Sequence, residues 1–405
     1  MIDKIVCGVD IGSQQIKATL LRIRRSGQID ILGIEEAPMR GLKKNGFSDM
    51  TEFSQNIHMI LSGLSRKTGF KMKDVQLGIG GPWVASRFSR AVIPLLDHAS
   101  KVVTEADIKK INKQARMLGV KMEEEILHDF PQYYILDDGN KVLDPLGMYA
   151  RKMAVGSLLI VMPVNLLMNI RKAVLQGGYE IAHVYFSPLA SSYACLTDEM
   201  TRRGCLLIDM GAATTNILFF KEGFLRSLDI IPFGGDHLTQ ALSESLHLPF
   251  ELAEDIKKSS AMVLKEDLKS AEEILVKKDD GYLHVKQDVV FETVESQVMK
   301  LEELIQEILQ FSHVREKLSC GVVLCGGASL LTGLIERLEK DWKLPVSLGK
   351  LQSNVFKNAC LYAGAVGLAI SIQRKQYRGS PGVLKPKNFL GRVTNHVQVL
   401  YEEYF

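Results

Sequence analysis

Residues 9–17 read VDIGSQQIK, and residues 209–216 read DMGAATTN. Each stretch follows a short apolar run, carries an Asp-x-Gly tip and leads into a second apolar run, which predicts two strands joined by a tight turn. Asp209 lies 199 positions after Asp10, a distance far longer than the period of any repeat array. The pattern therefore predicts two related domains in one chain.

The residue types at these tips favour phosphate binding. Glycine and small hydroxyl side chains let backbone N–H groups approach an anion, and the aspartate at the end of the strand can hold a hydrated divalent cation. A single Asp-x-Gly is typical of an ordinary hairpin turn. Two such tips facing each other would hold a polyphosphate from both sides, so the prediction depends on the pair.

Two further glycine-rich segments follow predicted strands. Residues 231–237, IPFGGDH, precede a helical pattern, and residues 321–329, GVVLCGGAS, form a buried strand and a Gly-Gly turn before a helix expected at 330–338. Bare backbone at such a turn admits a flat base or a phosphate. The chain contains neither a Walker A ending nor a GxGxxG fingerprint.

Length and composition limit the possible classes of protein. The 405 residues, 46% hydrophobic and 24% charged, are typical of a globular chain with two or three domains. A net charge of +3 is too small for a protein whose main partner is nucleic acid. The six scattered cysteines and the absence of a secretory signature predict a reducing, cytoplasmic location.

Taken together, these motifs resemble the actin-like ATPase superfamily and, within it, the FtsA family of bacterial cell-division proteins. VDIGS resembles the first phosphate loop of the superfamily, DMGAATTN the second, IPFGGDHLT the segment after it, and VVLCGGASLL the adenosine motif. Residues 128–137, HDFPQYYILD, and residues 144–148, DPLGM, resemble a subdomain that is inserted in the FtsA family. Actin, heat-shock ATPases and sugar kinases lack that insertion.

The resemblance implies an α/β fold, the actin-like (ribonuclease H-like) two-lobed ATPase fold, with the ligand in the cleft between the lobes. Subdomain 1A is then expected at residues 1–82 and 161–195, and the inserted FtsA-type subdomain 1C at residues 83–160. The second lobe (IIA/IIB) is expected at residues 196–348, and a return to 1A at residues 349–373.

The resemblance also implies ATP and Mg²⁺ as ligands. Asp10 would hold Mg²⁺ through water, and Asp209 is the second candidate catalytic residue. Glu254 and Lys257 correspond to ribose contacts in the family, although from the residues alone they indicate an ordinary i,i+3 charge pair on a solvated helix face. The candidate nucleotide-binding residues are Gly12, Ser13, Gln14, Lys17, Gly211, Ala212, Thr214, Thr215, Asn216, Gly234, Gly235, Glu254, Lys257, Gly326, Gly327 and Ala328, of which the last three would flank the adenine.

The second tip departs from the family pattern. Ala212 and Ala213 stand where the family usually has glycines, which leaves less room for backbone to approach a phosphate. Asn216 stands where the family usually has an acid, and an amide cannot accept a proton. These residues predict nucleotide binding with at most weak ATP hydrolysis. The tip also resembles PilM of type IV pilus assembly, and a small-molecule kinase on the same core is a further alternative.

The C-terminal segment is predicted to be a basic linker, residues 374–387, followed by an amphipathic helix, residues 388–405. Six basic and no acidic residues fall between positions 374 and 392. The helix would either lie on an anionic membrane surface, as the resemblance implies, or dock on the core of the protein. Its apolar stripe consists of Phe389, Val393, Val397, Leu400 and Tyr404.

Together with these features, the resemblance implies an ATP-binding, actin-like cell-division protein that associates with itself in filaments. It would lie peripherally on the cytoplasmic face of the inner (cell) membrane and link the C-terminal peptide of the tubulin-like FtsZ to that membrane. The PilM-like alternative would instead engage a short peptide of an inner-membrane pilus protein.

Overall fold

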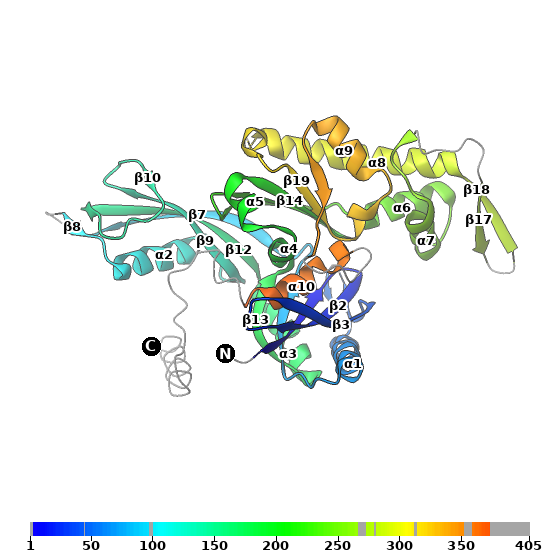
Figure 1. Cartoon of the computed structure of the whole chain (residues 1–405), viewed down its shortest axis with the longest axis horizontal. Coiled ribbons are helices and arrows are strands. Elements are labelled where there is room, and N and C mark those ends of the chain that lie inside the picture. Colours follow the sequence, from blue (N-terminus) through cyan, green and yellow to red (C-terminus); the bar gives the residue numbers. More distant parts are fainter. Residues whose placement is uncertain are drawn as a thin grey trace.

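Two five-stranded sheets with the same strand arrangement organise the chain (Figure 1). In each sheet, three consecutive strands form an antiparallel meander, and two later strands are added in parallel beside the first strand of the meander. The first sheet has the order β3-β2-β1-β6-β13 and the second has the order β16-β15-β14-β19-β20. The two sheets therefore have the same topology, and each contains one of the two predicted hairpins.

The strands of the two sheets have the following bounds. The first sheet consists of β1 (Lys4–Ile11), β2 (Gln15–Ile23), β3 (Ile29–Pro38), β6 (Asp74–Ile79) and β13 (Glu180–Phe186). The second consists of β14 (Cys205–Met210), β15 (Thr215–Lys221), β16 (Phe224–Ile231), β19 (Val322–Cys325) and β20 (Val346–Leu348). The central strands are apolar and buried over most of their length, as expected for strands that are covered on both faces.

The computed structural model describes residues 3–43, 45–96, 100–265, 273–278, 281–311, 314–351 and 359–372. The predicted linker at 374–387 and the predicted amphipathic helix at 388–405 lie outside these residues. No helix within the described residues is long and apolar enough to cross a membrane.

Two helices made largely of small and apolar residues lie between the sheets. They are α4 (Ser187–Cys195) and α10 (Ala363–Ile370), which pack against each other and are buried along their whole lengths. Helix α4 contacts strands of both sheets, and α10 packs on β1 and β2. One hydrophobic core therefore runs from the first sheet through these helices to one face of the second sheet.

Other helices cover the outer faces of the sheets. Helices α1 (Met50–Thr68) and α3 (Val164–Gln176) pack against each other on the first sheet. The paired strands β4 (Leu42–Lys43) and β5 (Gly46–Phe47) precede α1. The second sheet is accompanied by helices α5 (Asp198–Arg203), α6 (Gly235–Leu246), α7 (Phe250–Ser260), α8 (Gln287–Phe311) and α9 (Leu334–Trp342), the hairpin β17 (Glu273–Lys278) and β18 (Gly281–Lys286), and the 3₁₀ turns η2 (Arg315–Lys317) and η3 (Gly327–Leu330). A last 3₁₀ turn, η4 (Ala359–Tyr362), leads directly into α10.

A third sheet is inserted in the chain between β6 and β13, and it extends away from the rest of the molecule (Figure 1). It has the order β10-β9-β12-β7, and α2 (Glu105–Gly119) packs on one of its faces. Its strands are β7 (Ala85–Pro94), β9 (Glu124–Leu136), β10 (Lys141–Val142) and β12 (Lys152–Pro163), and the short strands β8 (Lys101–Val102) and β11 (Tyr149–Ala150) pair beside it.

The predicted boundary between residues 160 and 161 lies inside strand β12, which continues from the inserted sheet toward the first sheet. Ile160 and Met162 of this strand belong to the core of the first sheet, whereas Met153 and Val155 belong to the separate core of the insertion. One strand thus connects the two cores, and the subdomain bounds themselves stay predictions.

The helix predicted at 330–338 begins later than expected. A 3₁₀ turn, η3, follows strand β19, and α9 begins only at Leu334. Gly333 has φ +79° and caps the helix in the left-handed region, which interrupts the helical path before this point. Helix α9 therefore begins several residues after the Gly-Gly turn, and η3 directly follows that turn.

Candidate functional site

The two predicted tips have the same backbone geometry. In the first, the Gly12 N–H donates to the carbonyl of Gln15 at 3.0 Å, and in the second the Gly211 N–H donates to the carbonyl of Thr214 at 2.9 Å. Both tips face one cavity of about 560 Å³. The cavity lies between the sheets and is large enough for a drug-sized ligand.

Nearly all of the predicted site residues line this cavity. Thr215 does not, because its hydroxyl points to the other face of β15 and donates to the Phe233 carbonyl at 2.8 Å. Gly234 also lies outside the lining and packs on the backbone of the second tip. The predicted residues that line the cavity are Asp10, Gly12, Ser13, Gln14, Lys17, Asp209, Gly211, Ala212, Thr214, Asn216, Gly235, Glu254, Lys257, Gly326, Gly327 and Ala328.

Each aspartate accepts a hydrogen bond from a serine of helix α4. The Ser187 hydroxyl donates to Asp10 Oδ1 at 2.6 Å, and the Ser191 hydroxyl donates to Asp209 Oδ2 at 2.8 Å. Burial raises the pKa of Asp10, against the opposing effects of Ser187 and Lys17. Burial also raises the pKa of Asp209, to about 6, and the negative charge of Asp10 contributes to this rise. A divalent cation placed here would relieve this unfavourable burial of charge.

Lys17 supplies the positive charge of the first tip. Its side chain extends from β2, and its Nζ donates to the Leu361 carbonyl at 2.8 Å. The ammonium also opposes the rise in pKa that burial causes at both cleft aspartates. A cation among buried carboxylates is positioned to contact an anionic ligand in the same cavity.

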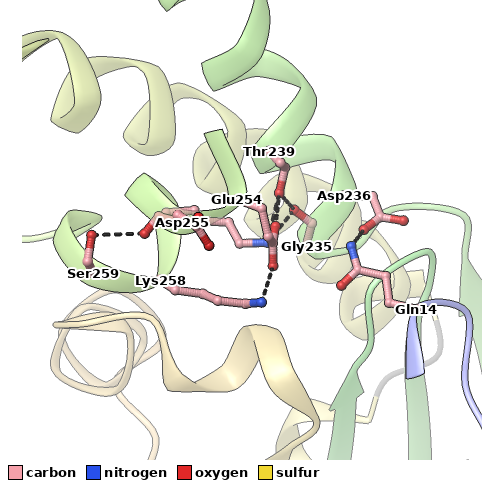
Figure 2. A network of polar contacts seen from close by, with 9 residues as sticks. Gln14, Gly235, Asp236, Thr239, Glu254, Asp255, Lys258 and Ser259 are labelled. Carbon is pink, nitrogen blue, oxygen red and sulfur yellow. Dashed lines mark hydrogen bonds and ion pairs between the residues drawn. The ribbon is translucent and has the colours of Figure 1, made fainter. Parts of the chain in front are cut away.

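Glu254 and Lys257 form the predicted ion pair, at 2.6 Å, but they do not lie on a solvated helix face. Their side chains are 12% and 13% exposed and line the cavity. Lys257 Nζ also donates to the Gly235 carbonyl at 3.0 Å and to Thr239 Oγ1 at 2.8 Å. The Thr239 hydroxyl and Lys258 bind the Glu254 carboxylate as well, as Figure 2 shows. Although burial acts to raise the pKa of Glu254, these partners lower it below its usual value.

One hydrogen bond crosses the cleft between the first tip and helix α6. Gln14 Nε2 donates to Asp236 Oδ1 at 2.5 Å (Figure 2). Burial raises the pKa of Asp236, although Lys257 opposes the rise. The first tip is therefore in direct contact with the second lobe.

Several residues of the site were not predicted. Ser187 and Ser191 contact the aspartates, Leu361 contacts Lys17, and Lys258 contacts Glu254. The only signal in the sequence was a pair of serines four positions apart after an apolar strand, which places both on one helix face. The contact between Lys17 and Leu361 joins segments that are 344 positions apart, whereas Lys258 lies one helical turn after Glu254, a local spacing that suits an ion pair.

The residues of the cavity fit a nucleotide with Mg²⁺. Mg²⁺ in proteins is usually held by one or two carboxylates together with phosphates and water, and the cavity offers Asp10 and Asp209. A Cβ atom on Gly326 would lie 2.7 Å from Asp209 Oδ1, so the glycine leaves this carboxylate room. Asn216 lines the cavity, and its buried Oδ1 has no hydrogen-bond partner among the described residues. Such an unsatisfied buried acceptor indicates a missing donor, such as bound water.

Comparison with known proteins gives matches over most of the chain. A family model described as "Cell division protein FtsA" matches residues 206–367, and one described as "SHS2 domain inserted in FTSA" matches residues 81–161. A protein of Pseudomonas aeruginosa named "Cell division protein FtsA" is 30% identical over 93% of this chain and 91% of its own length.

Solved structures show the fold. The structure titled "PilM-PilN type IV pilus biogenesis complex" matches with a TM-score of 0.63 at 15% identity, over 90% of this chain and 98% of that one. MreB5 of Spiroplasma citri bound to ADP matches with a TM-score of 0.56 at 13% identity, over 93% and 99%. These likenesses confirm the actin-like fold that the sequence predicted.

Proposed function

Since the chain belongs to the family of the cell division protein FtsA, we propose that it binds ATP with Mg²⁺ between its two sheets and tethers FtsZ to the membrane. The observation that carries the nucleotide part is the pair of hairpin tips, one from each sheet, that face a single cavity. Backbone N–H groups at such tips bind phosphates, and the aspartates before them bind a hydrated cation.

In this proposal different residues of the cavity bind the cation, the phosphates, the ribose and the adenine. Asp10 holds Mg²⁺ through water with Asp209 opposite it, while Lys17 and the two tips bind the phosphates. Mg²⁺ supplies charge neutralisation for the phosphate oxygens. Glu254 binds the ribose, and Gly326–Ala328 flank the adenine. The Lys257 ammonium has three N–H donors, and three acceptors already lie within hydrogen-bond distance of it: Glu254, the Gly235 carbonyl and Thr239 Oγ1. Lys257 therefore holds Glu254 in place and has no donor left for the ribose.

Nucleotide binding by the purified protein tests this part of the proposal. ATP and ADP are titrated in the presence of Mg²⁺ into the wild type and into Asp209→Ala. We expect micromolar ATP affinity in the wild type and a markedly weaker, still measurable affinity in the variant, because the variant lacks one of the two cleft carboxylates and keeps Asp10. Asp288→Ala, an exposed change at the start of α8, serves as the matched control. A wild type that binds neither nucleotide contradicts the proposal.

The membrane part is supported by the sequence of the C-terminal segment. A peripheral location on the cytoplasmic face of the inner membrane follows if the apolar stripe enters the lipid interface and the basic linker binds anionic headgroups. Removal of residues 387–405 should release the protein from anionic vesicles in a flotation assay, without unfolding it.

A matched pair of point variants sharpens the vesicle test. Val397→Glu places a charge on the apolar stripe, and Gln398→Glu places the same charge beside it. We expect only the first variant to lose vesicle binding. Equal binding by both would mean that the segment does not use this stripe.

The protein partner distinguishes the FtsA family from the PilM-like alternative, which shares the fold. Both family models and the Pseudomonas aeruginosa relative favour a cell-division partner, whereas the PilM likeness is one of fold. A pull-down with the C-terminal peptide of FtsZ, next to a peptide of a pilus protein, should retain the chain only on the FtsZ peptide. Self-association in filaments is tested by light scattering with ATP and Mg²⁺ on anionic vesicles.

A further inference from the structure

Helix α4 contacts the carboxylates of both lobes. Ser187 and Ser191 are four residues apart, which places them on one helix face. Ser187 bonds Asp10 of the first sheet, and Ser191 bonds Asp209 of the second. Ser191 Oγ also lies 3.2 Å from the carbonyl of Ser187. A single helix therefore fixes one oxygen of each cleft aspartate.

The remaining oxygen of each aspartate lies against a glycine. A Cβ atom on Gly364 of α10 would lie 2.4 Å from Asp10 Oδ2, and one on Gly326 would lie 2.7 Å from Asp209 Oδ1. Each carboxylate is thus held between a serine hydroxyl on one side and bare backbone on the other. The same arrangement in both lobes indicates that the orientation of the two carboxylates is set by the fold.

The serines of α4 do not all behave in this way. Serine in a helix often bonds a carbonyl of the preceding turn, and Ser192 does so, since its hydroxyl donates to the Leu189 carbonyl at 2.6 Å. Ser192 is as buried as its neighbours but contacts neither aspartate. The Ser187 hydroxyl donates to Asp10, and the Ser191 hydroxyl reaches Asp209 at 2.8 Å as well as the Ser187 carbonyl at 3.2 Å. Only these two serines contact the carboxylates, so Ser192 serves as a control for the effect of a buried serine in general.

We propose that Ser187 and Ser191 are positioning residues, which hold Asp10 and Asp209 in the orientation that receives the hydrated Mg²⁺ of a bound nucleotide. The inference rests on the proposed nucleotide binding and deepens it. Because α4 is buried and contacts both sheets, it keeps the two carboxylates in register across the cleft. Without a hydroxyl, the corresponding aspartate would turn away from the shared position.

The experiment measures how much Mg²⁺ strengthens ATP binding by the full-length chain. ATP affinity is determined by calorimetry in excess Mg²⁺ and in EDTA, for the wild type, Ser187→Ala, Ser191→Ala and the control Ser192→Ala. Because a hydrogen bond to a charged group contributes substantially to its orientation, we expect Ser187→Ala and Ser191→Ala each to reduce the Mg²⁺-dependent gain in ATP affinity roughly tenfold. Their affinity in EDTA and that of Ser192→Ala in both buffers should match the wild type.

A double variant tests whether Ser191 acts through its partner. In the Asp209→Ala background, Ser191→Ala should cause no further loss of the Mg²⁺-dependent gain, because the group that it positions is absent. If Ser191→Ala and Ser192→Ala reduce the gain equally, or if neither Ser187→Ala nor Ser191→Ala reduces it, the serines are structural and the inference is overturned. A wild type that binds ATP without any Mg²⁺-dependent gain also overturns it, while leaving nucleotide binding intact. A wild type that binds no ATP in either buffer overturns the proposed function together with it.

Discussion

The two hairpin tips share a backbone but differ in charge. In the first, Asp10 pairs across the strands with Lys17, and in the second Asp209 pairs with Asn216 at the equivalent register. Both tips are closed by the same glycine hydrogen bond, and both aspartates bond a serine of α4. The first tip therefore brings a cation into the cavity, and the second brings a neutral amide.

The strand arrangement shared by the two sheets therefore determines where side chains lie at the tips, and the sequence determines which chemical groups stand there. The Asp10–Lys17 pair compensates part of its own charge, whereas Asp209 has no cation in the equivalent cross-strand position. Burial raises the pKa of both aspartates, and that of Asp209 reaches about 6 with a contribution from the charge of Asp10. The second lobe thus contributes an acid whose charge is less well compensated by its own hairpin.

The largest effect is expected at the glycine beside Asp209. Gly326 has φ +85° and ψ +169°, a region that only glycine adopts readily, and an added Cβ would lie 2.4 Å from the Met210 carbonyl oxygen. Backbone strain together with overpacking predicts that Gly326→Ala lowers the free energy of unfolding by about 3 kcal/mol. Urea denaturation measures this, and a change below about 1 kcal/mol would contradict the assigned strain.

The next largest effect is the pH dependence that Asp209 adds to stability. Its pKa is about 6 in the folded protein and roughly 4 in the unfolded chain, so between these values only the folded state keeps the proton. Asp209 should therefore contribute a fall in the free energy of unfolding as pH rises from about 4 to about 6, by up to about 3 kcal/mol, and no further change above that range.

Asp209→Asn should remove this contribution to the slope, because the amide does not titrate in this range. The matched control is Asp288→Asn on the exposed start of α8, which should keep it. Denaturant titrations at several pH values compare the three proteins. Parallel curves for the wild type and Asp209→Asn would show that Asp209 has an ordinary pKa.

The third prediction concerns the different side chains at position 17 of the first tip and position 216 of the second. Lys17→Asn gives the first tip the amide of the second, and removal of a charged donor should weaken ATP binding by roughly ten- to hundredfold. Asn216→Ala removes only a neutral group and should weaken ATP binding by less than about tenfold. Fluorescent ATP binding measures both variants, and equal losses would mean that the charge difference between the tips does not affect the ligand.

The smallest effect on stability is expected at the glycine beside Asp10. Gly364 lies in helix α10 and has no positive φ, so replacement by alanine gains up to about 1 kcal/mol of helix propensity. The contact with Asp10 Oδ2 offsets this gain, because the carboxylate must shift. Gly364→Ala should therefore change the free energy of unfolding by less than about 1 kcal/mol while reducing the Mg²⁺-dependent gain in ATP affinity. A loss of stability as large as that of Gly326→Ala would contradict this difference.

The sequence predicted those parts of the site that depend on short stretches of chain. The Asp-x-Gly tips, the Gly-Gly turn after β19 and the helix that carries Glu254 could all be read from local patterns, and all of them line the cavity. Local patterns did not show that Thr214 lines the cavity and that Thr215 does not. Neighbouring side chains of a strand point to opposite faces, and which face meets the cavity depends on where the strand sits in the sheet.

The two hairpins follow from local sequence, because turn residues and apolar runs within about ten positions specify strand, tip and strand. Which side chains meet in the cleft depends on how distant segments pack together. Ser187 and Asp10 are 177 positions apart, and Gln14 and Asp236 are 222 positions apart. Such contacts exist only after the two sheets have packed on the helices between them. The orientation of the cleft carboxylates is therefore a property of the folded core, whereas their presence is a property of the chain.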